Sequence, residues 1–230
     1  MNYKPILILS GEPHSIFLEI FFKVKKKYNC KRPIILIVSE KLLFMQMSKL
    51  NFNYKINLID LKTDKLDKLN NKKINIINVD FHFKKAFDKI TDASNSYIEK
   101  SFQIALKLLK DQKCIGLING PISKKNFLKE KFYGITEYLA SKTNKKNKVA
   151  MLIYNKKLSV SPITTHLPLK KVHKHLTIKK IVTHIELISD FYKKKINKII
   201  NIGITGLNPH CESNYKSSEE DRIIRPAIKL

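Results

Sequence analysis

The feature that most constrains the fold is a regular alternation of short apolar runs with longer segments of helical length. Runs rich in Ile, Leu and Val that end at turn residues are typical of strands buried on both faces, and helices between them allow parallel pairing. Strands are expected at residues 5–10, 33–38, 54–61, 74–79, 115–119, 149–154, 158–164 and 199–205. Helices are expected at residues 16–27, 41–50, 96–113 and 177–195, with a last one beginning at the acidic residues 219–221. The pattern predicts an α/β fold with a largely parallel sheet.

Glycine is scarce, and its placement is informative. The chain has only six glycines, yet Gly11, Gly120 and Gly206 each directly follow an expected strand. Glycine at such positions predicts tight turns or a close approach of the backbone to a ligand. No GxGxxG or GxxxxGK[ST] motif is present, so neither a Rossmann fingerprint nor a P-loop is predicted.

The net charge of +26 raises the question of nucleic-acid binding. Only three of the 45 basic residues are arginines, whereas proteins that read bases depend on the bidentate arginine side chain. The lysines are spread over nearly every segment. We therefore expect non-specific attraction to polyanions, including an anionic substrate, but no specific nucleic-acid partner.

The cysteines and the hydropathy pattern indicate the compartment. Cys30, Cys114 and Cys211 are far apart in the sequence, which fits a reducing cytosol better than a disulfide framework. The first apolar run is too short for a signal peptide, and no stretch approaches the length of a membrane span. We expect a cytoplasmic protein without a membrane partner.

Two histidines, His166 and His210, lie in proline-marked turns just after expected strands. In an open α/β sheet, residues beyond the carboxyl ends of strands line the ligand crevice. Two imidazoles placed there from different strands are half of a metal site, because neutral imidazole is a common ligand of Zn²⁺ and similar ions. The alternative is a pair of unrelated loop histidines. Among the other histidines, His184 is expected to be exposed or to lie at a helix face.

Several segments, in order along the chain, resemble the metal-dependent 4-hydroxythreonine-4-phosphate dehydrogenases of vitamin B6 biosynthesis. The matching motifs are Gly11-Glu12-Pro13, Asn119-Gly120-Pro121 with Lys124, Gly134-Ile135-Thr136-Glu137, Thr164-Thr165-His166-Leu167-Pro168-Leu169 and Gly206-Leu207-Asn208-Pro209-His210. The two histidine motifs are the specific part of this resemblance.

The resemblance implies a fold, a reaction and a set of ligands. The fold would be the isocitrate/isopropylmalate dehydrogenase-like α/β/α fold with two intimately packed subdomains, assembled as a homodimer. The reaction would be the NAD-dependent oxidation and decarboxylation of 4-phosphooxy-L-threonine to 3-amino-2-oxopropyl phosphate. His166 and His210 would be two of three metal-binding histidines, with Zn, Mg or Co as the metal, and Thr136 would bind substrate. The resemblance assigns no catalytic or NAD-binding residue to this chain.

Two departures from the family pattern limit what the resemblance implies. Ile135 replaces a histidine that precedes the substrate threonine in the family, and isoleucine cannot form a hydrogen bond with substrate. His14 is one candidate to compensate. Relative to the family, residues 1–230 are expected to form a single incomplete dehydrogenase domain without the C-terminal part, which carries the third metal histidine. Two histidines alone would hold a metal weakly.

These departures leave three functional hypotheses. The first is the dehydrogenase of pyridoxal phosphate biosynthesis. The second is a related dehydrogenase of another phosphorylated hydroxy acid, such as a tetronate or threonate 4-phosphate, which Ile135 makes relevant. The third is a fragment without catalytic activity.

Overall fold

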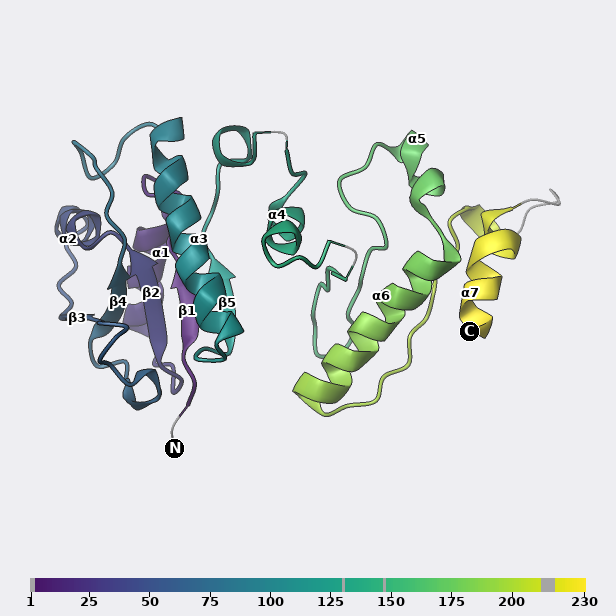
Figure 1. Ribbon diagram of the computed structural model, residues 1–230, viewed down its shortest axis with the longest axis horizontal. Coiled ribbons are helices and arrows are strands. Elements are labelled where there is room, and N and C mark those ends of the chain that lie inside the picture. The colour runs from purple at the N-terminus through teal and green to yellow at the C-terminus, as the bar shows by residue number, and fades with distance from the viewer. Residues whose placement is uncertain (1–2, 130, 147, 212–217) are drawn as a thin grey trace. The chain divides into compact units, whose positions relative to one another are not determined.

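The structure is a computed structural model that describes residues 3–129, 131–146, 148–211 and 218–230 (Figure 1). The chain divides into two compact units, residues 1–130 and residues 131–230. Each unit has its own arrangement of elements and is considered by itself.

The first unit is built on a five-stranded sheet in which every pairing is parallel. The strands are β1 (Ile6–Leu9), β2 (Ile34–Val38), β3 (Ile56–Leu58), β4 (Ile74–Asn78) and β5 (Gly116–Asn119), in the order β3-β4-β2-β1-β5. All five were predicted from the apolar runs, although β3 is shorter than expected. The all-parallel pairing confirms the sheet type that the alternating pattern predicts.

Helices cover both faces of this sheet. They are α1 (Phe17–Lys27), α2 (Glu40–Lys49) and α3 (Asn95–Lys110), each within three residues of its predicted bounds. Phe22 of α1 and Leu43 of α2 pack with Ile8, Leu36 and Ile76 of the sheet in one core cluster.

The helix α3 packs on β1 and β2 and lies over the sheet in Figure 1. Alternate residues of these strands, such as Leu7 and Ile35, are also fully buried, as are Phe102 and Ala105 of α3. Because successive side chains of a strand point to opposite faces, both faces of the sheet are covered. Each fully buried Leu, Ile or Phe contributes about 2 kcal/mol through its removal from water.

Two glycines allow the chain to make a tight contact beyond the ends of β1 and β5. Gly11 has a positive φ of 70°, and a Cβ atom there would lie 2.3 Å from the carbonyl oxygen of Pro121. A Cβ atom at Gly120 would lie 2.4 Å from the carbonyl oxygen of Ser10. The prediction of tight turns is confirmed at these two glycines, and the alternative, a close approach of the backbone to a ligand, stays a prediction.

The second unit is mainly helical in its described residues. Its helices are α4 (Ile135–Lys142), α5 (Leu169–Val172), α6 (Ile178–Phe191) and α7 (Arg225–Lys229). The largest, α6, packs against α7 through a core of Leu176, Ile181, Ile224 and Ala227. Short 3₁₀ and π turns complete the described structure of both units: Leu66–Lys68, Asp92–Ser94, Lys124–Leu128, His173–His175, Tyr192–Ile196, Pro209–Cys211 and Glu220–Ile224.

Three of the predicted strands are wrong. Residues 149–154 and 158–164 form only one antiparallel bridge, between Ile153 and Val160, and residues 199–205 form no strand. Several of their apolar side chains are exposed, Ile199 at 95%, whereas Ile163 and Ile204 are partly buried against the core of the second unit. A strand needs a neighbour to accept its backbone hydrogen bonds, and the described residues place none beside residues 199–205. The two histidine turns therefore do not follow strands in this structure.

His184 has one of its two predicted placements, a helix face, and not the exposed one. It lies on α6 but is 8% exposed, and its Nε2 is 2.6 Å from the hydroxyl of Ser161. Burial lowers the pKa of His184, and the nearby Lys180 lowers it further. The ring is a hydrogen-bonded core residue, and not an exposed one.

Candidate metal and substrate site

His166 lies in a turn whose backbone is strained. Its φ of 55° is in the left-handed region, which is costly for a residue with a Cβ atom. The preceding residue, Thr165, donates a hydrogen bond of 3.1 Å from its hydroxyl to Oε1 of Glu137. This bond joins the turn to the first turn of α4, which begins at Ile135.

Gly134 leaves space between His166 and α4. It occupies the N-cap position of α4, where a Cβ atom would lie 3.1 Å from Oε2 of Glu137 and 3.4 Å from Nε2 of His166. Thr136 follows in the first turn of α4 and is half-buried. The structure therefore brings the turn of His166 to Glu137 and the N-terminus of α4, the helix whose first turn also contains Thr136. His166 and Thr136 were predicted site residues.

His210 lies in a second strained turn. His210 has a φ of 64° and Cys211 a φ of 56°, so two consecutive residues with side chains are left-handed. The amide of Cys211 donates to the carbonyl oxygen of Asn208 at 3.2 Å. A Cβ atom at Gly206 would lie 2.4 Å from Sγ of Cys211, which confirms the predicted tight turn at this glycine.

The carboxylate of Glu220 closes this second turn. Its Oε1 accepts hydrogen bonds from the backbone amides of Leu207 and Asn208, at 2.9 and 2.8 Å. The side-chain amide of Asn208 donates to Oε2 at 3.0 Å. These donors, first the backbone amide of Asn208, lower the pKa of Glu220 to about 2. The carboxylate is therefore ionised at neutral pH.

Both histidines have the chemistry of metal ligands. Each is exposed, and the ring nitrogens of neither form a hydrogen bond with any residue that the structure describes. Free imidazole nitrogens suit Zn²⁺ and related ions. No group of three His, Cys, Asp or Glu side chains in the described part of the chain is placed to hold a metal ion.

Sequence reasoning missed the contacts of Glu137 and Glu220. Both residues were visible as acidic residues in the first turn of a helix, where they interact favourably with the helix dipole. The structure shows that each also receives hydrogen bonds from a histidine-bearing turn. The distance along the chain, 28 residues from Glu137 to Thr165, hides such a contact from local patterns.

The first unit carries buried polar groups at the carboxyl end of its sheet. Ser10 forms a 2.6 Å hydrogen bond with the hydroxyl of Tyr97, and burial raises the pKa of Tyr97 to about 12. Burial also raises the pKa of Glu12, which is only 2% exposed, while Ser94 and His14 lower it by less. The ring of His14 packs edge-on against Phe81. The hypothesis that His14 compensates for Ile135 stays a prediction.

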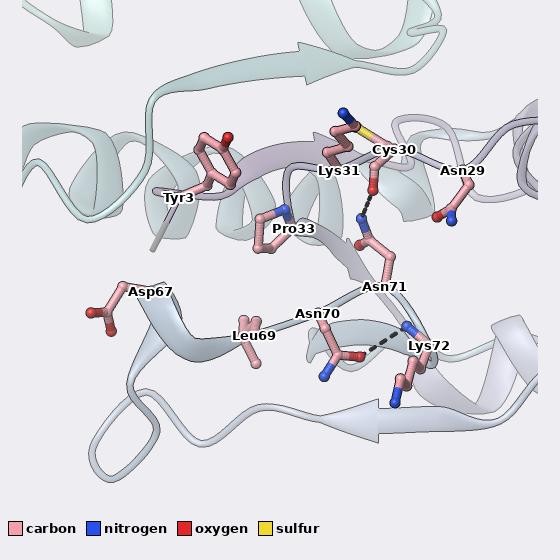
Figure 2. A pocket seen from close by; sticks show the side chains of 10 residues that line it. All are labelled: Tyr3, Asn29, Cys30, Lys31, Pro33, Asp67, Leu69, Asn70, Asn71 and Lys72. Carbon is pink, nitrogen blue, oxygen red and sulfur yellow. Dashed lines mark hydrogen bonds between the residues drawn. The ribbon is translucent and has the colours of Figure 1, made fainter. Parts of the chain in front are cut away.

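A cavity of about 830 Å³ lies at the opposite, amino end of the same sheet. Figure 2 shows its lining, which includes Tyr3 before β1, Pro33 before β2 and Lys72 before β4. In open parallel sheets, ligands bind beyond the carboxyl ends of the strands. The cavity contains none of the predicted site residues, and we assign it no role.

Among the described residues, no helix is long and apolar enough to cross a membrane. The three cysteines are free thiols, of which Cys114 is buried and Cys30 and Cys211 are exposed.

Comparison with known proteins places these features in a family. The family model described as pyridoxal phosphate biosynthetic protein PdxA matches residues 29–230. The 4-hydroxythreonine-4-phosphate dehydrogenase of Sulfurihydrogenibium sp. (strain YO3AOP1) is 34% identical over 97% of this chain and 69% of its own. The enzyme of the same name from Hydrogenobaculum sp. (strain Y04AAS1) is 30% identical over 96% of this chain and 70% of its own.

Solved structures show the same fold. A 4-hydroxythreonine-4-phosphate dehydrogenase from Klebsiella pneumoniae superposes with a TM-score of 0.83 at 22% identity, covering 98% of this chain and 71% of that one. The corresponding structure from Burkholderia phymatum gives a TM-score of 0.80 at 22% identity, covering 99% of this chain and 70% of that one. The predicted α/β fold with a parallel sheet, of the isocitrate dehydrogenase-like type, is confirmed.

Proposed function

The chain belongs to the PdxA family of pyridoxal phosphate biosynthetic proteins, and from this premise we propose the reaction that it catalyses. The reaction is the NAD-dependent, metal-dependent oxidation and decarboxylation of 4-phosphooxy-L-threonine to 3-amino-2-oxopropyl phosphate. The observation that supports it most directly is the family match, which runs through both histidine turns and the Thr136 segment.

The residues of the second unit have distinct roles in this proposal. His166 and His210 hold a divalent metal, Zn²⁺, Mg²⁺ or Co²⁺, through ring nitrogens that no described residue engages. Thr136, half-buried in the first turn of α4, binds the substrate through its hydroxyl. When bound, the metal supplies Lewis acidity toward the substrate hydroxyl, and NAD⁺ supplies a hydride acceptor.

Ile135 favours a second candidate substrate. It directly precedes Thr136 in the sequence and its side chain has no hydrogen-bonding atom, so a polar contact expected in this family is absent from this position. A site that forms a hydrogen bond with one substrate group rejects substrates without that group, and a site without the hydrogen-bonding side chain loses this selectivity. The second candidate function is therefore the oxidation of another 4-phosphorylated hydroxy acid, a tetronate or threonate 4-phosphate.

The test is NADH formation by the 230-residue protein with each phosphorylated substrate in turn, with added Zn²⁺, Mg²⁺ or Co²⁺. We expect 4-phosphooxy-L-threonine to give the highest kcat/KM, and the His166→Ala variant to lose this activity. A higher kcat/KM with a tetronate or threonate phosphate would establish the second candidate. No NADH with any substrate would contradict both and favour the fragment without catalytic activity.

Further parts of the proposal concern assembly and location. We propose a homodimer that acts on a small phosphorylated substrate in the cytoplasm, without a specific nucleic-acid or membrane partner. The free cysteines support a reducing compartment. Residues 1–230 form part of one dehydrogenase domain, in keeping with a match over about 70% of each relative. Light scattering with size-exclusion chromatography tests the dimer.

A further inference from the structure

The turn that carries His210 is held by a carboxylate from outside it. Glu220 is 3% exposed and lies 10 residues beyond His210, at the start of the π turn that leads into α7. Its Oε1 receives two backbone amides of the turn and its Oε2 receives the side chain of Asn208.

The turn needs such support because its backbone is strained. His210 and Cys211 are both left-handed without being glycine, and such conformations persist only where the surroundings fix them. The amides that Glu220 fixes belong to Leu207 and Asn208, directly before the strained pair. In Glu220→Gln one uncharged oxygen remains to accept the two backbone amides, so these bonds weaken, and the NH2 group at the other position cannot accept from the Asn208 side chain.

We propose that Glu220 is a positioning residue for the proposed metal ligand His210, which acts by holding the 206–211 turn that carries the imidazole ring. This inference rests on the proposed function for the role of His210. The Glu220 carboxylate is engaged by turn donors, so it acts through the turn and not as a ligand. Groups that orient a metal ligand from outside affect metal affinity by about 10- to 100-fold.

Cys211 gives a reporter of the turn that is independent of the metal. Its Sγ packs against Gly206 within the turn, and the residue is exposed. In a Cys30→Ser background it is the one exposed cysteine, whereas buried Cys114 reports global unfolding.

We expect Glu220→Gln to speed the reaction of Cys211 with dithiobis-nitrobenzoate about tenfold in metal-free protein, with Cys114 still protected. The control Glu186→Gln removes an exposed acid on α6 and should change neither rate.

Metal affinity then tests the link to His210. We expect Glu220→Gln to weaken Co²⁺ binding about tenfold in the otherwise native chain and to have no further effect in a His210→Ala background. An unchanged Cys211 rate in Glu220→Gln would overturn the inference. A Co²⁺ affinity that His210→Ala leaves unchanged would instead overturn the proposed role of His210, whatever the Cys211 rate. Equal weakening by Glu220→Gln in both backgrounds would show a structural effect that does not act through His210, and would also overturn the inference.

Discussion

At the scale of the single residue, the two proposed metal ligands both have a left-handed backbone conformation. His166 and His210 have φ values of 55° and 64°, although neither is glycine. Each such residue costs about 1–3 kcal/mol, and strain of this kind is concentrated at functional sites. Six other described residues with side chains share this conformation, among them Lys129 and Asn197 at the ends of π turns, so the strain alone does not distinguish a functional residue.

This strain leads to a prediction for His210→Gly. Glycine adopts positive φ without steric cost, so we expect the free energy of unfolding to stay constant or to rise by about 1 kcal/mol. The matched control is His173→Gly, because His173 is exposed and has a helical φ of −57°. Glycine at that position should lower the free energy of unfolding by about 1 kcal/mol. Equal losses in both variants, measured by urea denaturation, would argue against strain at His210.

Glu12 leads to a second prediction at this scale. Neither of its carboxylate oxygens has a hydrogen bond within normal geometry to a described residue, and burial raises its pKa above 4.5. Because the pKa of Glu12 is higher in the folded protein than in the unfolded chain, ionisation of this carboxyl group lowers the free energy of unfolding. This destabilisation is present at neutral pH and disappears well below pH 4.5, where the group is protonated in both states.

We therefore expect Glu12→Gln to stabilise the protein by about 1 kcal/mol at pH 7, the scale of a buried group without a partner, and to have little effect at pH 3. The exposed Glu19, which pairs with Lys23 four residues later, is the control, because surface pairs contribute little. A destabilised Glu12→Gln in thermal unfolding at pH 7 would contradict this account of the carboxyl group.

Local patterns could identify the residues but not their contacts. The histidine motifs and Thr136 could be found because residue types recur at fixed spacing within a few positions. The contacts of Glu137 with Thr165 and of Glu220 with Asn208 join residues far apart in sequence. Tertiary structure alone brings these pairs together.

At the scale of the element, prediction succeeded where strands were paired and failed where they were not. β1, β2 and β4 are buried on both faces, and such strands appear in the sequence as continuous apolar runs. The run at residues 199–205 looks the same in sequence but has no partner strand among the described residues. An apolar run shows the capacity to form a strand, and pairing decides whether one forms.

The helix α6 contains a pH-sensitive contact. His184 bonds to Ser161, and burial lowers its pKa below the ordinary 6.5. Because the pKa of His184 is lower in the folded protein, the unfolded chain takes up a proton at a higher pH than the folded protein does. The free energy of unfolding is therefore highest above pH 6.5 and decreases as the pH falls below that value.

We expect the thermal midpoint to fall between pH 7 and pH 5, and His184→Gln to flatten this dependence. The exposed His175 provides the control, and His175→Gln should leave the slope unchanged. The same slope in the wild type and in His184→Gln would assign the pH dependence to other groups.

At the scale of the whole molecule, the charge of +26 predicts behaviour that is independent of the active site. Lysines spread along the chain, with only three arginines, favour contacts with phosphates and give little base discrimination. We expect duplex DNA of any sequence to bind with similar, strongly salt-dependent affinity in fluorescence anisotropy. A preference of more than about tenfold for one sequence would point to a dedicated nucleic-acid function.

The central claim, that His166 and His210 hold a divalent metal in a dehydrogenase of the PdxA family, can be tested by NMR of the seven histidine rings. Zn²⁺ would be titrated into protein with ¹⁵N-labelled histidine, and each ring assigned by single His→Ala variants. The account predicts that the ring nitrogens of His166 and His210 shift first and together, before those of exposed His173 and His175. Equal shifts of all exposed rings, or none at His166 and His210, would contradict it.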